Sequence, residues 1–454
     1  MMIKPSIPKG TRDFGPAVVK KRQYIFQTIR ETFELFGFQP LETPSMENLS
    51  TLTGKYGEEG DKLIFKILDN GDILGRAQQA KDSRELATLL CEKALRYDLT
   101  IPFARYVVMN QHELALPFKR YQMQPVWRAD KPQKGRYREF YQCDADVVGS
   151  NSLLNEVELL LIYDRVFSKL GMQGYEVRVN NRKILSGLAE LIGKPELLTD
   201  ITISIDKLDK IGLQGVQQEL LDRGLSQQDV DIVNSFLQIQ GNNQEKLQQL
   251  QVLLQSSPVA QKGIEELSYV LNSGLANFNS PPIVDVTLAR GLNYYTGMIV
   301  EAKGPASVKM GSIGGGGRYD DLTGLFGLPG LSGVGISFGV DRIYDVLEEL
   351  QLFPATAQQS TKILFLNMGE ASMPVAFKHV MQLREQGISA ELYHEPAKMD
   401  KQMKYADKRG IPYVVIIGES ELQENNVSAK NLQTGQQDKV AMDDLLGYFY
   451  CLVS

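Results

Sequence analysis

Two neighbouring strands with an unusual shared face constrain the fold of this chain most. Tyr121–Trp127 and Arg136–Val148 are predicted as β-strands, and Pro132 and Gly135 are turn residues in the spacer between them. Side chains alternate between the two faces of a strand. One face of the second strand therefore carries, in order, Arg136, Arg138, Phe140, Gln142, Asp144 and Asp146. In an antiparallel hairpin, Arg128 from the first strand joins this face.

This face favours a nucleotide site. The planar guanidinium group of arginine binds phosphate oxygens bidentately, and an aromatic ring such as Phe140 can stack on a base. Asp146 can receive an ammonium group or a ring N–H. We therefore predict a nucleoside triphosphate beside a small amphoteric ligand. The alternative is a solvated hairpin with surface ion pairs, which contribute little energy. The grouping of charges and aromatic rings on one face favours the first interpretation.

Four further segments carry weaker signals. Asp98 and Thr100, on one face of a predicted strand, could hold an ammonium group or be an ordinary surface aspartate and a cap. Arg290–Gly297 contains paired tyrosines but could simply end a strand. Gly314–Gly317 permits close approach of the backbone to a ligand, yet matches no phosphate-loop pattern. The strand Gly333–Gly339 leads into a helix with Arg342 in its first turn, where anions are favoured, unless Arg342 only pairs with Asp341 or Asp345.

The remaining pattern indicates several domains. Helical periodicity covers Ala17–Phe36 and residues 152–170. Lys62–Asp72 alternates as a hairpin would, and 76–94 is polar enough for a loop or a solvated surface. Residues 185–280 are rich in Leu and Gln at helical spacing. A linker of composition QLFPATAQQST spans 351–361, and beyond it strands alternate with helices, which indicates a separate module with a largely parallel sheet.

Composition narrows the class of protein. The 49 basic and 55 acidic side chains give a net charge of −6, which excludes a broadly basic nucleic-acid coat but not a local basic groove. Three separated cysteines favour a reducing cytoplasm, and three histidines argue against a histidine-rich metal centre. We recognise no signal peptide or membrane span, so we expect a cytoplasmic protein.

Together these segments resemble class II aminoacyl-tRNA synthetases, and specifically the histidyl-tRNA synthetase family, over nearly the whole chain. Phe38–Pro44 resembles motif 1 with its dimer-interface proline, 127–140 resembles motif 2, and Gly335–Arg342 resembles motif 3. Arg290–Gly297 and Gly314–Asp320 resemble the two histidine-specific motifs. Ile7–Asp13 is similar to the family's N-terminal signature, and the terminal module to its anticodon-binding domain.

The resemblance implies an α+β fold, with an antiparallel sheet flanked by helices. It implies a catalytic domain in two parts, 1–184 and 281–350, a mostly helical insertion at 185–280, a linker at 351–361 and an anticodon-binding domain at 362–454. It also implies a homodimer without a membrane partner.

The implied reaction joins L-histidine to ATP as histidyl-adenylate and then transfers it to the 3′ end of histidine tRNA. ATP would bring Mg²⁺, and no zinc is expected. Arg290 and Arg128 would be the catalytic residues, acting on the α-phosphate. The implied ATP-binding side chains are Arg128, Arg136, Arg138, Phe140 and Arg342.

The implied histidine-binding side chains are Asp98, Thr100, Gln142, Asp146, Arg290, Tyr294, Tyr295 and Tyr319. Among them, Asp98, Thr100 and Gln142 would bind the ammonium group, and Asp146 and Tyr295 the two ring nitrogens. Gln133 would meet the acceptor end of the tRNA. Lys398, Lys401, Lys404 and Lys408 would contact the tRNA backbone, unless they are only a solvated helix face.

Four positions depart from the usual family pattern: Asp130, Asn293, Asp98 and Asp146. Three of them keep a carboxylate, so the departures indicate a branch similar to the eukaryotic-type enzymes. Competing interpretations are a non-catalytic paralogue that regulates a phosphoribosyltransferase, a prolyl or threonyl enzyme, and a tRNA-binding adaptor. The arginines at 128, 290 and 342 and the terminal module argue against the first, and the paired tyrosines against the second.

Overall fold

The structure, a computed structural model, describes residues 4–54, 57–272, 274–289, 294–354, 357 and 361–453. The chain divides into two compact units. The larger extends to Leu352 apart from Phe14–Lys21, and the smaller comprises Phe14–Lys21 together with the chain from Phe353 onward.

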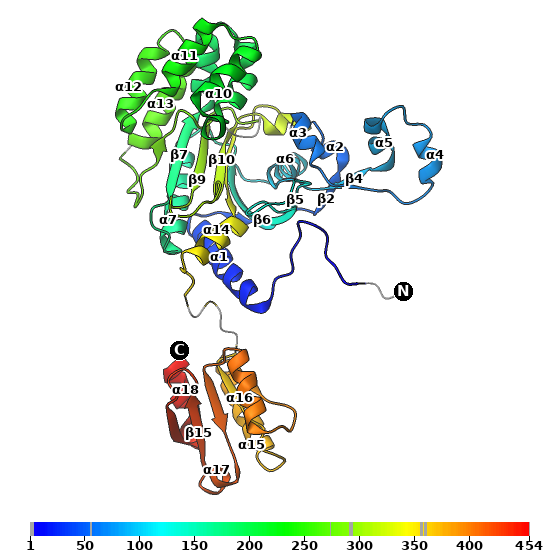
Figure 1. Cartoon of the computed structure of the whole chain (residues 1–454), viewed down its shortest axis with the longest axis vertical. Coiled ribbons are helices and arrows are strands. Elements are labelled where there is room, and N and C mark those ends of the chain that lie inside the picture. The colour runs from blue at the N-terminus through cyan, green and yellow to red at the C-terminus, as the bar shows by residue number, and fades with distance from the viewer. Residues whose placement is uncertain are drawn as a thin grey trace. The chain divides into compact units, whose positions relative to one another are not determined.

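An eight-stranded sheet forms the centre of the larger unit, in the order β1-β5-β6-β11-β10-β9-β7-β8 (Figure 1). Its strands are β1 (Gln39–Pro40), β5 (Phe118–Trp127), β6 (Glu139–Val148), β7 (Glu176–Asn181), β8 (Ile283–Val284), β9 (Met298–Lys303), β10 (Gly314–Tyr319) and β11 (Gly333–Gly339). Only the outer pairs β1–β5 and β7–β8 are parallel within the described sheet. The antiparallel, helix-flanked sheet that the sequence predicted is therefore confirmed.

Three helices cover one face of this sheet: α1 (Pro16–Leu35), α7 (Leu154–Lys169) and α14 (Val340–Glu349). Phe338 on β11 is fully buried, and its ring centroid lies 5.9 Å from that of Phe33 on α1 and 4.7 Å from that of Tyr163 on α7. This aromatic core uses the side chains of β6 and β11 that point away from Gln142 and Asp144. The opposite face of the central strands is thereby left for the site.

Between β1 and β5 the chain forms a smaller sheet and four short helices, and then the longer helix α6 (Thr100–Met109). The strands β2 (Met46–Asn48), β3 (Lys66–Ile67) and β4 (Lys93–Leu95) pair in the order β2-β4-β3, and the helices are α2 (Leu49–Leu52), α3 (Gly57–Lys62), α4 (Ile73–Ala77) and α5 (Ser83–Leu90). The predicted hairpin at Lys62–Asp72 is wrong, because β3 pairs instead with β4, some 26 residues further along. Residues 76–94, predicted as a loop or solvated surface, are not a loop, because they contain α5 and the end of α4.

Capping side chains explain the helices at 73–90. Asp72 Oδ1 accepts a hydrogen bond from the backbone N–H of Gly75 at 2.9 Å, and Asp82 Oδ1 accepts one from Glu85 at 2.8 Å. Such caps satisfy the free N–H groups of a first turn. The signal Asp82-Ser-Arg-Glu85 was visible in the sequence but was outweighed by the polar composition around it.

The segment 182–272 is helical, as its periodicity predicted. It contains α8 (Arg182–Leu191), α9 (Leu198–Ile205), α10 (Leu208–Asp222), α11 (Gln227–Leu237), α12 (Asn243–Leu253) and α13 (Pro258–Asn272). Figure 1 shows α10 to α13 gathered at one end of the large sheet. Ser226 and Asn242 form capping boxes at the starts of α11 and α12.

The smaller unit has its own sheet, in the order β13-β12-β14-β15-β16. β12 (Ile363–Phe365), β13 (Ala390–Leu392) and β14 (Tyr413–Ile416) are parallel, as predicted, with α15 (Met373–Glu385) and α16 (Met399–Lys408) between them. The sequence analysis missed the antiparallel pair β15 (Asn426–Asn431) and β16 (Gln437–Ala441). Two short helices, α17 (Glu419–Gln423) and α18 (Leu445–Val453), complete the unit.

Candidate active site

The uncovered face of β5, β6, β10 and β11 holds a cavity. Strand register sets its walls, because Asp146 lies opposite Arg120 on β5 and Gly335 on β11, while Asp144 lies opposite Gln122 and Ser337. The cavity is lined by Asp98, Thr100, Arg128, Gln142, Asp144, Asp146, Tyr294, Tyr295, Gly315, Gly316, Tyr319, Gly335, Ile336 and Ser337. The structure thus brings together most of the side chains predicted to bind histidine.

Glycines make room for this cavity. A Cβ atom at Gly335 would lie 2.0 Å from Asp146 Oδ1, and one at Gly333 would lie 2.2 Å from the ring of Tyr319. At Gly315, by contrast, the nearest atom to an added Cβ would be the carbonyl oxygen of Val300, at 3.4 Å. The glycines of β11 thus leave room for Asp146 and Tyr319. The predicted glycine cluster is itself a strand, β10, in which an added Cβ at Gly317 would lie 2.9 Å from the ring of Tyr295.

A buried arginine and two buried carboxylates form the floor of the cavity. Arg120 is fully buried, and its Nη2 lies 2.8 Å from Asp146 Oδ2. Burial raises the pKa of Asp144 to about 7, opposed by the charge of Arg120 and reinforced by that of Asp146. Burial likewise raises the pKa of Asp146, opposed by Arg120. These two carboxyl groups therefore bind protons more readily than exposed carboxylates do. They favour cationic or N–H-bearing ligands.

Three tyrosines close one end of the cavity. Tyr319 donates a hydrogen bond to Asp146 Oδ1 at 2.7 Å, and the ring centroid of Tyr294 lies 5.0 Å from that of Tyr295 and 6.1 Å from that of Tyr319. Burial, reinforced by the nearby carboxylates, raises the pKa of Tyr295 above its usual range. Its phenol therefore remains a hydrogen-bond donor at neutral pH.

Arg128 and Phe140 lie next to one another beside this cavity. The guanidinium carbon of Arg128 is 4.2 Å from the ring centroid of Tyr97 and 5.1 Å from that of Phe140. Its Nε donates to the carbonyl of Tyr97 at 3.1 Å, and Nη2 lies 3.5 Å from Gln142 Oε1. The Gln142 amide in turn donates to Ser337 Oγ at 2.9 Å. The predicted juxtaposition of arginine, aromatic ring and amide is present.

The strand expected to begin at Arg136 begins at Glu139 instead. Gln133 and Arg136 exchange backbone hydrogen bonds of 3.1 and 2.9 Å in a tight turn, in which Gly135 has a φ of +71°. Arg136 and Arg138 therefore belong to the loop before β6 and not to its regular face. Gln133 is exposed, and the Arg136 side chain is 41% exposed, with Nη1 3.6 Å from Asp130 Oδ1.

Arg342 reaches this same loop. Its Nε donates to the carbonyl of Gly135 at 2.6 Å, and its Nη1 donates to the carbonyl of Ser312 at 2.6 Å. Asp341 beside it binds two other arginines, Arg12 and Arg22. Arg342 is thus placed in the first turn of α14, as predicted, and joins the loop that carries Arg136.

Asp98 and Thr100 are not on a strand. Thr100 is the first residue of α6 (Thr100–Met109), and Asp98 Oδ1 accepts a hydrogen bond from the backbone N–H of Ile101 at 3.2 Å. The pair therefore reaches the cavity from a helix start, where the aspartate satisfies a free N–H group. The two-residue spacing of Asp98 and Thr100 was interpreted as the alternation of a strand, whereas Thr100 begins a helix.

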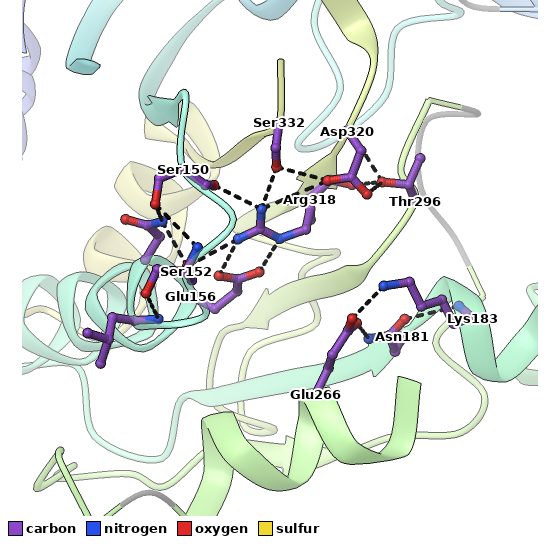
Figure 2. A network of polar contacts seen from close by, with 12 residues as sticks. Ser150, Ser152, Glu156, Asn181, Lys183, Glu266, Thr296, Arg318, Asp320 and Ser332 are labelled. Carbon is purple, nitrogen blue, oxygen red and sulfur yellow. Dashed lines mark hydrogen bonds and ion pairs between the residues drawn. The ribbon is translucent and has the colours of Figure 1, made fainter. Parts of the chain in front are cut away.

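Arg290, Gly291, Leu292 and Asn293 lie outside the described residues, so the placement of the predicted catalytic Arg290 is not described. The segment that follows is anchored firmly. Thr296 donates to Asp320 Oδ2 at 2.6 Å, and Asp320 Oδ1 accepts from Ser332 at 2.9 Å (Figure 2).

A buried ion pair is connected to this anchor through Ser332. Figure 2 shows Arg318 between Glu156 of α7 and Ser332. Arg318 Nη2 donates to Glu156 Oε2 at 2.7 Å, Nη1 donates to Ser332 Oγ at 2.6 Å, and both charged residues are buried. This network links the tyrosine segment, the glycine strand and α7.

Sequence reasoning missed three polar groups of this site. Asp144 was placed on the correct face but given no role, while Arg120 and Ser337 were not singled out. Arg120 stands two and four residues before Gln122 and Gln124, so its face was predictable from alternation. Its place opposite Asp146 depends on strand register, which no single strand reveals.

Searches for related proteins agree with this geometry. A family model described as histidyl-tRNA synthetase matches residues 10–343, and one described as an anticodon binding domain matches 362–452. The Histidine–tRNA ligase of Christiangramia forsetii is 57% identical, covering 98% of this chain and 99% of the relative, and that of Porphyromonas gingivalis is 55% identical, covering 97% and 98%. The crystal structure of a histidyl-tRNA synthetase from Nostoc superposes with a TM-score of 0.84 at 31% identity, covering all of both chains.

A sheet of this topology with a polar cavity on its open face, followed by an anticodon-binding module, defines an aminoacyl-tRNA synthetase. The chain belongs to the histidyl-tRNA synthetase family. It is therefore an enzyme, a ligase that charges tRNA with histidine, and synthetases in general use ATP and Mg²⁺.

Two further findings concern the described residues alone. None of the helices described is long and apolar enough to cross a membrane. No group of three or more His, Cys, Asp or Glu side chains among these residues is arranged to hold a metal ion.

Proposed function

We propose that the cavity beside Arg128 is where the chain activates histidine with ATP, forming histidyl-adenylate and pyrophosphate. The observation that carries this proposal is the convergence of side chains from separate segments on one cavity. Asp98 and Thr100 come from the start of α6, Gln142 and Asp146 from β6, and Tyr319 from β10. Carboxylates and hydroxyl groups of this kind suit an ammonium group and an imidazole ring.

The ATP-binding roles are proposed for residues beside β6 and in the loop before it. Arg128 would hold the α-phosphate, and Phe140 would stack on adenine. Arg136, Arg138 and Arg342 would neutralise the outer phosphates, whose charge Mg²⁺ shares as part of the substrate complex. The arginines near Gly135 support this assignment, since Arg342 already binds the loop that carries Arg136.

On the amino-acid side, Asp98, Thr100 and Gln142 would bind the ammonium group. Asp146 and Tyr295 would face the imidazole ring, with Tyr294 and Tyr319 beside them. Arg290 would stabilise charge that develops on the α-phosphate. No protein nucleophile is required, because the carboxylate of histidine attacks the phosphorus. Positioning and electrostatics would supply the catalysis.

The remaining features of the proposal concern the protein around the site. Gln133, which is exposed, would meet the acceptor end of tRNA. Residues 1–184 and 281–350 would be the two parts of the catalytic domain, and 185–280 the insertion. Residues 362–454 would read the anticodon after a linker at 351–361. The enzyme would act in the cytoplasm as a homodimer formed through Phe38–Pro44.

Pyrophosphate exchange tests the first step directly. With ATP, Mg²⁺ and labelled pyrophosphate, we expect exchange with histidine and none above background with the other standard amino acids. Exchange supported by a different amino acid would reject the assignment. A monomer at micromolar concentration would contradict the proposed dimer without affecting the cavity.

A further inference from the structure

The N-terminal segment Ile7–Asp13 has no task in the proposed function, although it packs beside the site. It lies against the loop before β6, residues 128–138, which carries two of the arginines proposed to bind the outer phosphates of ATP. The carbonyl oxygen of Gly10 accepts a hydrogen bond from the backbone N–H of Arg138 at 2.9 Å. A Cβ atom at Gly10 would lie 2.8 Å from side-chain carbons of both Arg138 and Pro132. The segment is therefore in direct contact with this loop.

Arg12 connects the same loop to α14. Its guanidinium carbon lies 3.3 Å from the ring centroid of Tyr137, which stands between the two loop arginines in the sequence. Its Nη2 donates to Asp341 Oδ1 in the first turn of α14, directly before Arg342. A guanidinium group that both stacks on a ring and pairs with a carboxylate is held in one orientation. One side chain thus contacts the sequence neighbours of all three arginines proposed for the outer phosphates.

The surrounding contacts allow the fold to survive without the Arg12 side chain. Tyr137 also donates from its hydroxyl group to Asp345 Oδ2 on α14, at 3.2 Å. Asp341 forms a second ion pair, with the buried Arg22. Loss of Arg12 therefore leaves no uncompensated buried carboxylate, which would be costly. Its loss should instead change the position of the loop relative to α14.

We propose that Arg12 is a positioning residue for ATP. It holds the loop before β6 and the first turn of α14 so that the guanidinium groups on both converge on the outer phosphates, and it does not itself touch ATP. This inference rests on the proposed function of the cavity and extends it to the N-terminal segment. A small misplacement of such groups weakens binding and catalysis strongly. The side chains proposed for histidine come from α6, β6 and β10, so they should keep their places.

Pyrophosphate exchange by the full-length enzyme tests the inference, with ATP and then histidine as the varied substrate. For Arg12→Ala, we expect the KM for ATP to rise about 10- to 100-fold, as for misplaced binding groups, and the KM for histidine to stay unchanged. A merely structural role would lower the active fraction and leave both KM values as they are. The control Lys9→Ala removes one positive charge from an exposed position of the same segment and should keep both values.

A double variant shows whether Arg12 acts through the loop. Residues that act through one another have non-additive effects. In Arg12→Ala combined with Arg138→Ala, the KM for ATP should therefore rise by less than the product of the two single factors. A rise equal to that product would overturn the inference.

Three other results would also overturn it: an unchanged KM for ATP in Arg12→Ala, an equal rise of both KM values, or the same rise in Lys9→Ala. If Arg12→Ala does not fold, Arg12→Gln, which keeps a hydrogen-bond donor of similar length, is judged by the same two KM values. Wild-type enzyme is tested first for histidine-dependent exchange, so a failure there refutes the proposed function and not the role of Arg12.

Discussion

At the scale of single residues, Asp144 provides a buried carboxylate that can bind a ligand, but its burial lowers the stability of the folded protein. Burial raises the pKa of Asp144 to about 7, whereas an aspartate in the unfolded chain titrates near ~3.9. Between these values the folded state binds more protons than the unfolded state. The free energy of unfolding therefore decreases as the pH rises from about 4 through 7, and the destabilisation is complete above that range.

Replacing this carboxylate should reverse that loss. We expect Asp144→Asn to melt at least about 2 °C higher than the wild type at pH 8, because the neutral amide avoids a buried charge. The difference should shrink as the pH falls to 5, where Asp144 is protonated in the folded wild type. Thermal unfolding of both proteins at pH 5, 6, 7 and 8 measures it. A difference that is constant across this range would show that the charge of Asp144 is not its cause.

Alternation along a strand predicted which residues share the cavity face. It could not predict which side chains of different strands contact one another. Gln142, Asp144 and Asp146 were placed on one face because side chains of a strand alternate. The ion pair of Asp146 with Arg120 needs the register between β5 and β6, which is a property of two strands together. The surroundings of Asp144 depend in addition on β11, whose Ser337 lies opposite Asp144 although it is 193 positions further along the chain.

At the scale of secondary-structure elements, the local pattern predicted the long periodic segments, but it did not predict the exact length or the partner of the shortest strands. The helices α1 and α7 and the strand β11 each bury a mainly apolar face, so their pattern is local. By contrast, β1, β3 and β8 contain two residues each and exist only because a partner strand lies beside them. Tertiary pairing therefore decides these strands, and local composition does not.

The ion pair between α7 and β10 should be a strong link in the fold. Removing one partner of a buried pair leaves an uncompensated charge, which typically costs about 3–5 kcal/mol. Glu156→Gln is thus expected to lower the free energy of unfolding by about that amount, since Glu156 is fully buried against Arg318. Denaturant titration measures the change.

Glu158 on the same helix provides the matched control. Its ion pair with Lys119 is at the surface, with 42% of the Glu158 side chain exposed, and such pairs contribute about 0–1 kcal/mol. Glu158→Gln should therefore change stability little. Equal losses in the two variants would mean that the Arg318 network does not stabilise the fold more than a surface contact does.

At the scale of the whole molecule, a protein with a net negative charge must bind tRNA, which is also negatively charged. The net charge of −6 opposes tRNA binding, so local basic surfaces must supply the attraction. In the smaller unit, Lys401, Lys404 and Lys408 are exposed on α16 at positions i, i+3 and i+7, which share one face of a helix. Lys398 precedes them at the start of that helix and is also exposed.

If this lysine face contacts the phosphate backbone, reversing one charge should affect tRNA charging and spare the first reaction step. We expect Lys404→Glu to raise the KM for tRNA, and to reduce the slope of log KM against log salt by about 1, as for one lost phosphate contact. Histidine-dependent pyrophosphate exchange needs no tRNA, so its rate should not change. The control Lys439→Glu reverses one charge on β16, where Lys439 is 61% exposed, and should leave both reactions unchanged. Similar losses of tRNA charging in the two variants would point to net charge alone, and an unaltered KM in Lys404→Glu would leave this face as ordinary solvated surface.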